Sequence, residues 1–194
     1  MRGMGWEGLV GTESGVVLVT VALLPLAVQA AISLARGRMA RGTSPATAWR
    51  RSVAEVGMAY GTLPGVWMTM LPGMRAGEVT GAVSLVPLRD LATMSSFQVV
   101  GNLLIFAALG FLAPLRFSAL ASVLRVTVVA AALSALVETA QYVLRLDRVS
   151  SVDDILLNAT GAGIASAVSL GSVWVYRFAA QLWAHRGHRT RSAQ

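Results

Sequence analysis

Uncharged, mostly apolar runs alternate along the chain with short segments that carry most of its charge. The uncharged runs cover residues 15–35, 56–74, 91–115 and 155–176. Each is near or above the ~18 residues that indicate a transmembrane helix, because ~20 residues at 1.5 Å rise cross about 30 Å of hydrocarbon. Allowing for a fourth apolar segment that carries Arg125 and Glu138, the pattern predicts spans at about 15–35, 53–71, 97–115, 117–144 and 153–176.

The composition agrees with this pattern. Of the 194 residues, 55% are hydrophobic and 13% are charged, whereas about 25% are charged in an ordinary soluble domain. We therefore predict an all-α, polytopic membrane helix bundle with one membrane domain, residues 15–177. An extracytoplasmic N-terminus (1–14) precedes it and a basic tail (178–194) follows. The first span has a longer apolar core than a signal peptide and no net positive segment before it, so we interpret it as a retained anchor.

The arginines predict the orientation of the bundle, because positive residues are enriched in short cytoplasmic loops. With the N-terminus outside, eleven arginines fall inside: Arg36, Arg38, Arg41, Arg50, Arg51, Arg116, Arg125, Arg177, Arg186, Arg189 and Arg191. Five fall outside: Arg2, Arg75, Arg89, Arg145 and Arg148. We expect the C-terminus in the cytoplasm. Topology then accounts for the net charge of +7 without a nucleic-acid partner, and the tail is expected to contact anionic lipid headgroups.

Placing a polar side chain within the membrane costs free energy, so each such residue is a candidate for a functional role. They are Asn102, Glu138, Gln141, Asn158 and the adjacent Asp153 and Asp154. Counted along three different spans at 1.5 Å per residue, all lie ~5–10 Å below the outer surface. Glu138 and Gln141 share one helix face by their i, i+3 spacing, and Asp154 and Asn158 share one by i, i+4. The coincidence in depth predicts a polar site in the outer leaflet.

Structural interpretations of the same residues stay open. Ser151 and Asp154 match a capping box at a helix start. Glu138 is expected either to form an ion pair with Arg145 or Arg148 or to transfer protons. The three amides are compatible with interhelical hydrogen bonds. Nearer the cytoplasm, Glu55 is expected to pair with Arg50 and Arg51.

Several chemistries lack support in the sequence. There is no cysteine, so thiolate metal sites and disulfides are excluded. Glu138, Asp153 and Asp154 are possible oxygen ligands for a hard cation, but no known loop spacing accompanies them, and we predict neither a metal nor a cofactor. The histidines, His185 and His188, lie in the tail. "GAGIAS" lies within the last span, where Gly161/Ala165 and Gly163/Ala167 predict close helix packing.

The segment between the second and third spans, residues 72–96, contains the apolar stretch "VTGAVSLVPL" (79–88). At ten residues it is too short to cross the bilayer. It is expected either to lie along the membrane interface or to re-enter the membrane.

Four motifs occur in order along residues 84–167: "SLVPL" (84–88), "NLLIFAALGF" (102–111), "SALVETAQ" (134–141) and "RVSSVDDILLNATG" (148–161). Together they resemble the VanZ-like family of bacterial membrane proteins. The chain departs from that pattern at Ser84, Ala108 and Ser151 and keeps the Asn, Glu, Gln and Asp-Asp positions. The namesake of the family is associated with teicoplanin resistance. The resemblance implies a role in the cell envelope, in the bacterial cytoplasmic membrane, and specifies no reaction.

Three functions remain as expectations. In the first, the site binds a lipid-linked wall precursor or a glycopeptide antibiotic through Asn102, Gln141, Arg148 and Asn158. In the second, the protein is an enzyme acting on an envelope lipid, with Glu138, Asp153 and Asp154 as acid and base. In the third it is a small lipid transporter, although the sequence contains no internal repeat. Whether the protein is an enzyme stays open.

Overall fold

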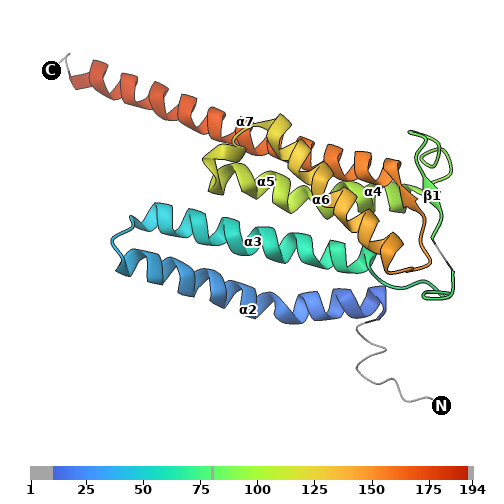
Figure 1. Cartoon of the computed structure of the whole chain (residues 1–194). Coiled ribbons are helices and arrows are strands. Elements are labelled where there is room, and N and C mark those ends of the chain that lie inside the picture. Colours follow the sequence, from blue (N-terminus) through green and yellow to red (C-terminus); the bar gives the residue numbers. More distant parts are fainter. Residues whose placement is uncertain (1–10, 80, 192–194) are drawn as a thin grey trace.

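The computed structural model describes residues 11–79 and 81–191, and of residues 177–180 and 182–191 it describes the backbone only. Long helices run side by side and form a bundle (Figure 1). They are α2 (Glu13–Ala40), α3 (Pro45–Thr69), α4 (Ser96–Ile105), α5 (Ala107–Arg116), α6 (Val123–Val143) and α7 (Val152–Arg191), with a short 3₁₀ helix, η1 (Ser118–Leu120). The predicted all-α bundle is confirmed.

Four helical segments of the described chain are long and apolar enough to cross a membrane: 13–40, 96–116, 123–143 and 152–176. The second comprises α4 and α5, which are separated at Phe106. Helix α3 overlaps the predicted second span and packs beside α2 and α5, but it is not among these four. Its first turns carry Arg50, Arg51 and Glu55, which lower its apolarity. The predicted basic tail begins inside α7, whose helix continues to Arg191. The tail's predicted lipid contacts involve side chains outside the described residues.

The segment that joins α3 to α4 contains no helix in its described residues. It contains β1 (Val83–Ser84), which pairs in parallel with β2 (Ser150–Ser151) just before α7, with Val83 opposite Ser150. This two-stranded sheet lies at the end of the bundle where α3 and α6 finish and where α4 and α7 begin (Figure 1). The pairing therefore fixes the long connection to the start of α7.

Small residues allow α7 to lie close to its neighbours. A Cβ atom on Gly161 would collide with the backbone of Leu103 in α4, and one on Gly110 in α5 would collide with the backbone of Ala162. A Cβ on Gly163 would lie 2.6 Å from the Thr127 hydroxyl oxygen in α6. The structure confirms the close packing expected from the small residues of α7, since Cβ atoms essentially never approach other atoms so closely.

At the opposite end of the bundle, Glu55 joins three helices. Its carboxylate accepts hydrogen bonds from Arg38 of α2 and from Arg116 of α5. Arg38 also donates to Ser52. The expected pairing of Glu55 with Arg50 and Arg51 is wrong, because guanidinium groups from two neighbouring helices occupy both carboxylate oxygens.

Candidate functional site

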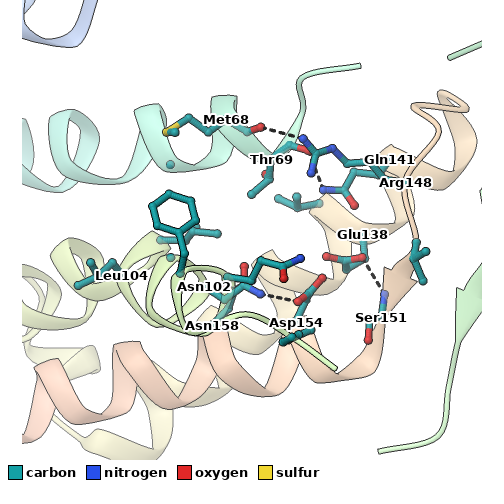
Figure 2. A pocket seen from close by; sticks show the side chains of 18 of the residues that line it. Met68, Thr69, Asn102, Leu104, Glu138, Gln141, Arg148, Ser151, Asp154 and Asn158 are labelled. Atoms are coloured by element: carbon teal, nitrogen blue, oxygen red, sulfur yellow. Dashed lines mark hydrogen bonds between the residues drawn. The ribbon is translucent and has the colours of Figure 1, made fainter. Parts of the chain in front are cut away.

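A cavity of about 830 Å³ lies between α3, α4, α6 and α7, at the end of the bundle that carries the β1–β2 pair. The predicted site residues that line it are Asn102, Glu138, Gln141, Arg148, Asp154 and Asn158. Figure 2 shows them around one space, contributed by α4, α6, α7 and, for Arg148, the connection between α6 and α7. Of the predicted residues, only Asp153 is not in the lining. The convergence that the sequence predicts from depth is present in the fold.

The side chain of Glu138 connects α6 to the start of α7. Its residue is 7% exposed. Its Oε2 accepts a hydrogen bond from the Ser151 backbone N–H at 3.0 Å, and the Ser150 hydroxyl donates to the Glu138 carbonyl oxygen at 3.0 Å. Among the described residues Glu138 forms no ion pair with Arg145 or Arg148. The direct ion pair expected from the sequence is absent: Arg148 donates to the carbonyl groups of Leu71 and Met68 instead, and acts on Glu138 only as a nearby positive charge.

The adjacent aspartates point to different places, as neighbours on a helix must when each residue turns the chain by about 100°. Asp154 points into the cavity and accepts a hydrogen bond from the Asn102 side-chain amide (Figure 2). Asp153 is 2% exposed. Its carboxylate accepts backbone N–H groups of the connection between β1 and α4, from Leu88 at 2.5 Å, Asp90 at 2.9 Å and Leu91 at 3.0 Å. Asp154 thus belongs to the cavity, and Asp153 holds the loop beside it.

The loop that Asp153 holds has an unfavourable backbone conformation. Leu88 has φ of 66°, in the left-handed region that costs a non-glycine residue about 1–2 kcal/mol. The Leu88 N–H that this conformation turns inward donates to Asp153. The buried carboxylate therefore helps to keep the loop in a shape that its sequence alone disfavours.

Ser151 caps α7, but not in the predicted arrangement. Its hydroxyl oxygen accepts the Asp153 N–H at 3.1 Å, whereas a capping box uses the N–H of the third helical residue, Asp154. The Ser151 N–H donates to Glu138 instead of Asp154. Its hydroxyl also donates to the Asp90 carboxylate at 2.6 Å and so holds the pKa of Asp90 below its usual value. Asp90 lines the cavity and carries no sequence signal, because only the β1–β2 pairing brings it there.

Arg148 and Gln141 satisfy the C-terminal end of α3. A helix leaves its last four carbonyl groups without intrahelical partners. Gln141 donates from Nε2 to the Thr69 carbonyl oxygen at 2.9 Å. Arg148 donates from Nε to the Leu71 carbonyl oxygen at 3.1 Å and from Nη2 to that of Met68 at 3.4 Å. Both residues line the cavity and also fix α3 against the end of α6.

Asn158 lies deepest in α7 among the polar lining residues. It is 4% exposed. Its Nδ2 donates to the Ser134 hydroxyl oxygen of α6 at 2.7 Å. Its Oδ1 is buried and has no hydrogen-bond partner. Leaving a buried acceptor unpaired costs about 1–3 kcal/mol, so this atom is available to a donor that the protein itself does not supply.

The other part of the cavity is apolar. Its lining includes Met68 of α3, Val137 of α6 and several residues of α4, among them Phe97, Leu104 and Ile105. Phe97 and Leu104 are 75% and 61% exposed, so the cavity reaches the outer surface of the bundle, which a membrane would cover with lipid. The cavity is therefore amphipathic: its polar end is buried between α6 and α7, and its apolar side faces outward beside α4.

Carboxylate and amide groups supply the chemistry of this site. Glu138 and Asp154 each use one oxygen on a protein donor, which leaves the other for a ligand. The described residues contain no group of three or more His, Cys, Asp or Glu side chains placed to hold a metal ion. The arrangement is suited to hydrogen bonding and, where the two carboxyl groups meet one ligand, to proton transfer.

The fold and this cavity define a multi-pass helical membrane protein with a polar site near one end of its bundle. The VanZ/LLP1 family model matches residues 62–175. Since the match covers more than half of the chain, the protein belongs to the VanZ/LLP1 family, as the motifs predicted. The matched region includes every predicted site residue and begins within α3. Comparison with curated proteins and with solved structures found no significant match.

Proposed function

We propose that this protein binds the head of an amphiphilic cell-envelope molecule, a lipid-linked wall precursor or a glycopeptide antibiotic, at the outer leaflet of the bacterial cytoplasmic membrane. The observation that carries the proposal is the amphipathic cavity. Its volume of about 830 Å³ is within the usual range of ligand pockets, about 300–1,000 Å³. Such pockets combine mostly apolar walls with a few polar groups that orient the ligand.

The exposed side of the cavity supports entry from the membrane. Phe97 and Leu104 stand at the bundle surface, and a hydrocarbon tail that remains among lipids would pass between α3 and α4. The head would then reach Asn102, Asp154 and Asn158 without crossing the apolar core of the bundle. This arrangement suits a molecule that is already anchored in the bilayer.

A second candidate is an enzyme that acts on the same class of molecule. It is favoured by one observation: the carboxyl groups of Glu138 and Asp154 both point into the cavity (Figure 2). Two carboxyl groups in different environments are suited to act as acid and base. Asp153 takes no part in this proposed catalysis, because backbone N–H groups of the loop occupy both oxygens of its carboxylate.

Filling the cavity tests the binding proposal. Gly101 lines the cavity, and a Cβ there would meet nothing within 4 Å, so Gly101→Leu adds an apolar side chain at the cavity wall with open space around its first carbon. Gly171 in α7 also has open space around its Cβ and does not line the cavity, which makes Gly171→Leu a matched control. We expect native mass spectrometry of the purified protein to detect an envelope lipid in the wild type and in Gly171→Leu, and to detect none in Gly101→Leu. Equal occupancy in all three proteins would count against the proposal.

Glu138→Gln separates binding from catalysis. The amide oxygen of glutamine still accepts the Ser151 N–H, while the side chain no longer exchanges a proton. A binding protein is expected to leave the composition of the envelope lipid pool the same in this variant as in the wild type, even where the variant holds its ligand less tightly. If the protein is an enzyme, expression of the wild type is expected to alter the envelope lipid pool, and expression of Glu138→Gln is expected to leave it unaltered.

A further inference from the structure

Acidic groups far outweigh basic ones around the cavity. The lining contains the carboxylates Glu13, Asp90, Glu138, Asp147 and Asp154, and Arg148 is the basic residue among these described lining residues. Asp147 forms an ion pair with Arg75, with 3.7 Å between Oδ1 and Nη2. The guanidinium of Arg148 is directed to the carbonyl groups that end α3. Among the described side chains no salt bridge reaches Glu138 or Asp154, so Arg148 is left as one nearby positive charge for two deep carboxylates.

The unpaired Oδ1 of Asn158 is an independent sign of a missing donor. Asn158 is 96% buried, by its exposed fraction of 4%, and it lines the same cavity. In this orientation Nδ2 donates to the Ser134 hydroxyl oxygen, and Oδ1 is the amide atom left without a partner. The deep end of the cavity therefore offers acceptors: the Asn158 oxygen together with the free oxygens of Glu138 and Asp154.

We propose that the head recognised in this cavity is a primary ammonium group, carried by an amphiphile whose tail leaves the bundle between α3 and α4. This inference rests on the proposed function and specifies the class of its ligand. A primary ammonium has three N–H donors and no acceptor, which matches one amide oxygen and two carboxylates. It also supplies the positive charge that carboxylates removed from water require.

Other head groups fit this end of the cavity less well. A phosphate would place negative charge beside Glu138 and Asp154, and charge repulsion is strong where water is excluded. A sugar without an amine supplies hydroxyl donors but adds no positive charge to the one that Arg148 gives the two carboxylates. Arg148, which donates to carbonyl groups at the end of α3, is the cationic group in the described lining for a phosphate that belongs to the same head.

Binding of single-chain probes with equal tails tests the proposal. Full-length protein is exposed to dodecylamine, dodecyl glucoside and dodecyl phosphate, and retained probe is measured by native mass spectrometry across a concentration series. We expect dodecylamine to bind at least about tenfold more tightly than the other two, since a hydrogen bond to a charged group contributes about 1.5–3 kcal/mol. Glu138→Gln, Asp154→Asn and Asn158→Leu are each expected to reduce this preference by about tenfold. Glu78→Gln, an exposed acid outside the lining, is expected to keep it.

Two further probes distinguish the source of the ammonium. Lyso-phosphatidylethanolamine carries it beside a phosphate, and a dodecyl glycoside of glucosamine carries it on a sugar. Tight binding of either one that depends on Glu138 and Asp154 supports the proposal and identifies the source. Failure of both to bind more tightly than dodecyl glucoside would overturn it.

The outcomes also separate this inference from the proposed function. If all head groups bind equally and Gly101→Leu abolishes their binding, the proposed preference for an ammonium is wrong, and the proposed binding of an amphiphile is supported. If no probe or native lipid binds and Gly101→Leu changes nothing, both are wrong. Thermal unfolding of each variant shows whether it is folded, and Glu78→Gln provides the matched reference.

Discussion

Replacing Asp153 by asparagine is expected to release the loop before α4 while leaving the cavity groups unchanged. The carboxylate accepts the Leu88 N–H on one oxygen and the Asp90 and Leu91 N–H groups on the other. An asparagine has one acceptor oxygen. In its better orientation it keeps the Asp90 and Leu91 bonds, and its NH₂ group then faces the Leu88 N–H.

The cost follows from these bonds. One charge-assisted hydrogen bond is lost and two others become neutral, which together amount to at least about 2 kcal/mol. If amide exchange in the loop proceeds through local opening, 2 kcal/mol corresponds to roughly 30-fold faster exchange. The strained backbone at Leu88, with φ of 66°, favours the same opening.

Hydrogen exchange followed by mass spectrometry measures this directly on a peptide that contains residues 88–91. Asp154→Asn is the matched control, because the neighbouring acid faces the cavity and touches none of these amides. It is expected to leave exchange in the loop unchanged. Equal acceleration in both variants, or no acceleration in Asp153→Asn, would refute the division of roles between the two aspartates.

Other predictions follow from the remaining contacts. Arg148→Ala removes the guanidinium that ends α3 and is expected to cost about 2 kcal/mol, or a Tm decrease of roughly 4–8 °C in a thermal-unfolding assay, whereas the exposed Arg89→Ala is expected to cost almost nothing; equal Tm values would contradict the capping role. Gly161→Leu places a side chain against the Leu103 backbone and is expected to reduce the yield of folded protein in size-exclusion chromatography, with Gly171→Leu as the tolerated comparison. The orientation is tested with a cysteine at Val149, which is 53% exposed: an impermeant maleimide is expected to label intact cells, and labelling only after lysis would reverse the predicted topology. The lowered pKa of Asp90 means that its bond to Ser151 stabilises the loop above the usual Asp pKa of about 3.9 and that this contribution is lost as the pH falls through the lowered value; loop exchange should therefore become less acid-sensitive in Ser151→Ala, and unchanged acid sensitivity would argue against it.

Several features of the fold and of the site could be predicted from the sequence alone. The uncharged runs determined the helical segments, because the cost of burying charge in a bilayer depends on composition along the chain. Motif order and spacing determined the family. Counting residues along each span placed Asn102, Glu138 and Asn158 at one level, and the cavity confirms that they meet. The small residues of α7 indicated its close packing before any neighbour was known.

Only the tertiary structure decided what each polar group touches. Asp153 and Asp154 are adjacent and identical residues, and the sequence does not distinguish their roles. In the structure Asp153 accepts the backbone N–H groups of Leu88, Asp90 and Leu91, whereas Asp154 lines the cavity. The partners of Glu55 come from helices 17 and 61 residues away, and those of Arg148 from carbonyl groups more than 70 residues away. The hydropathy pattern indicates how far below the membrane surface a residue of a span lies. The partner of its side chain depends on how neighbouring helices are rotated and how closely they pack. Those choices are made by long-range contacts, and they determine which acid is structural and which is open to a ligand.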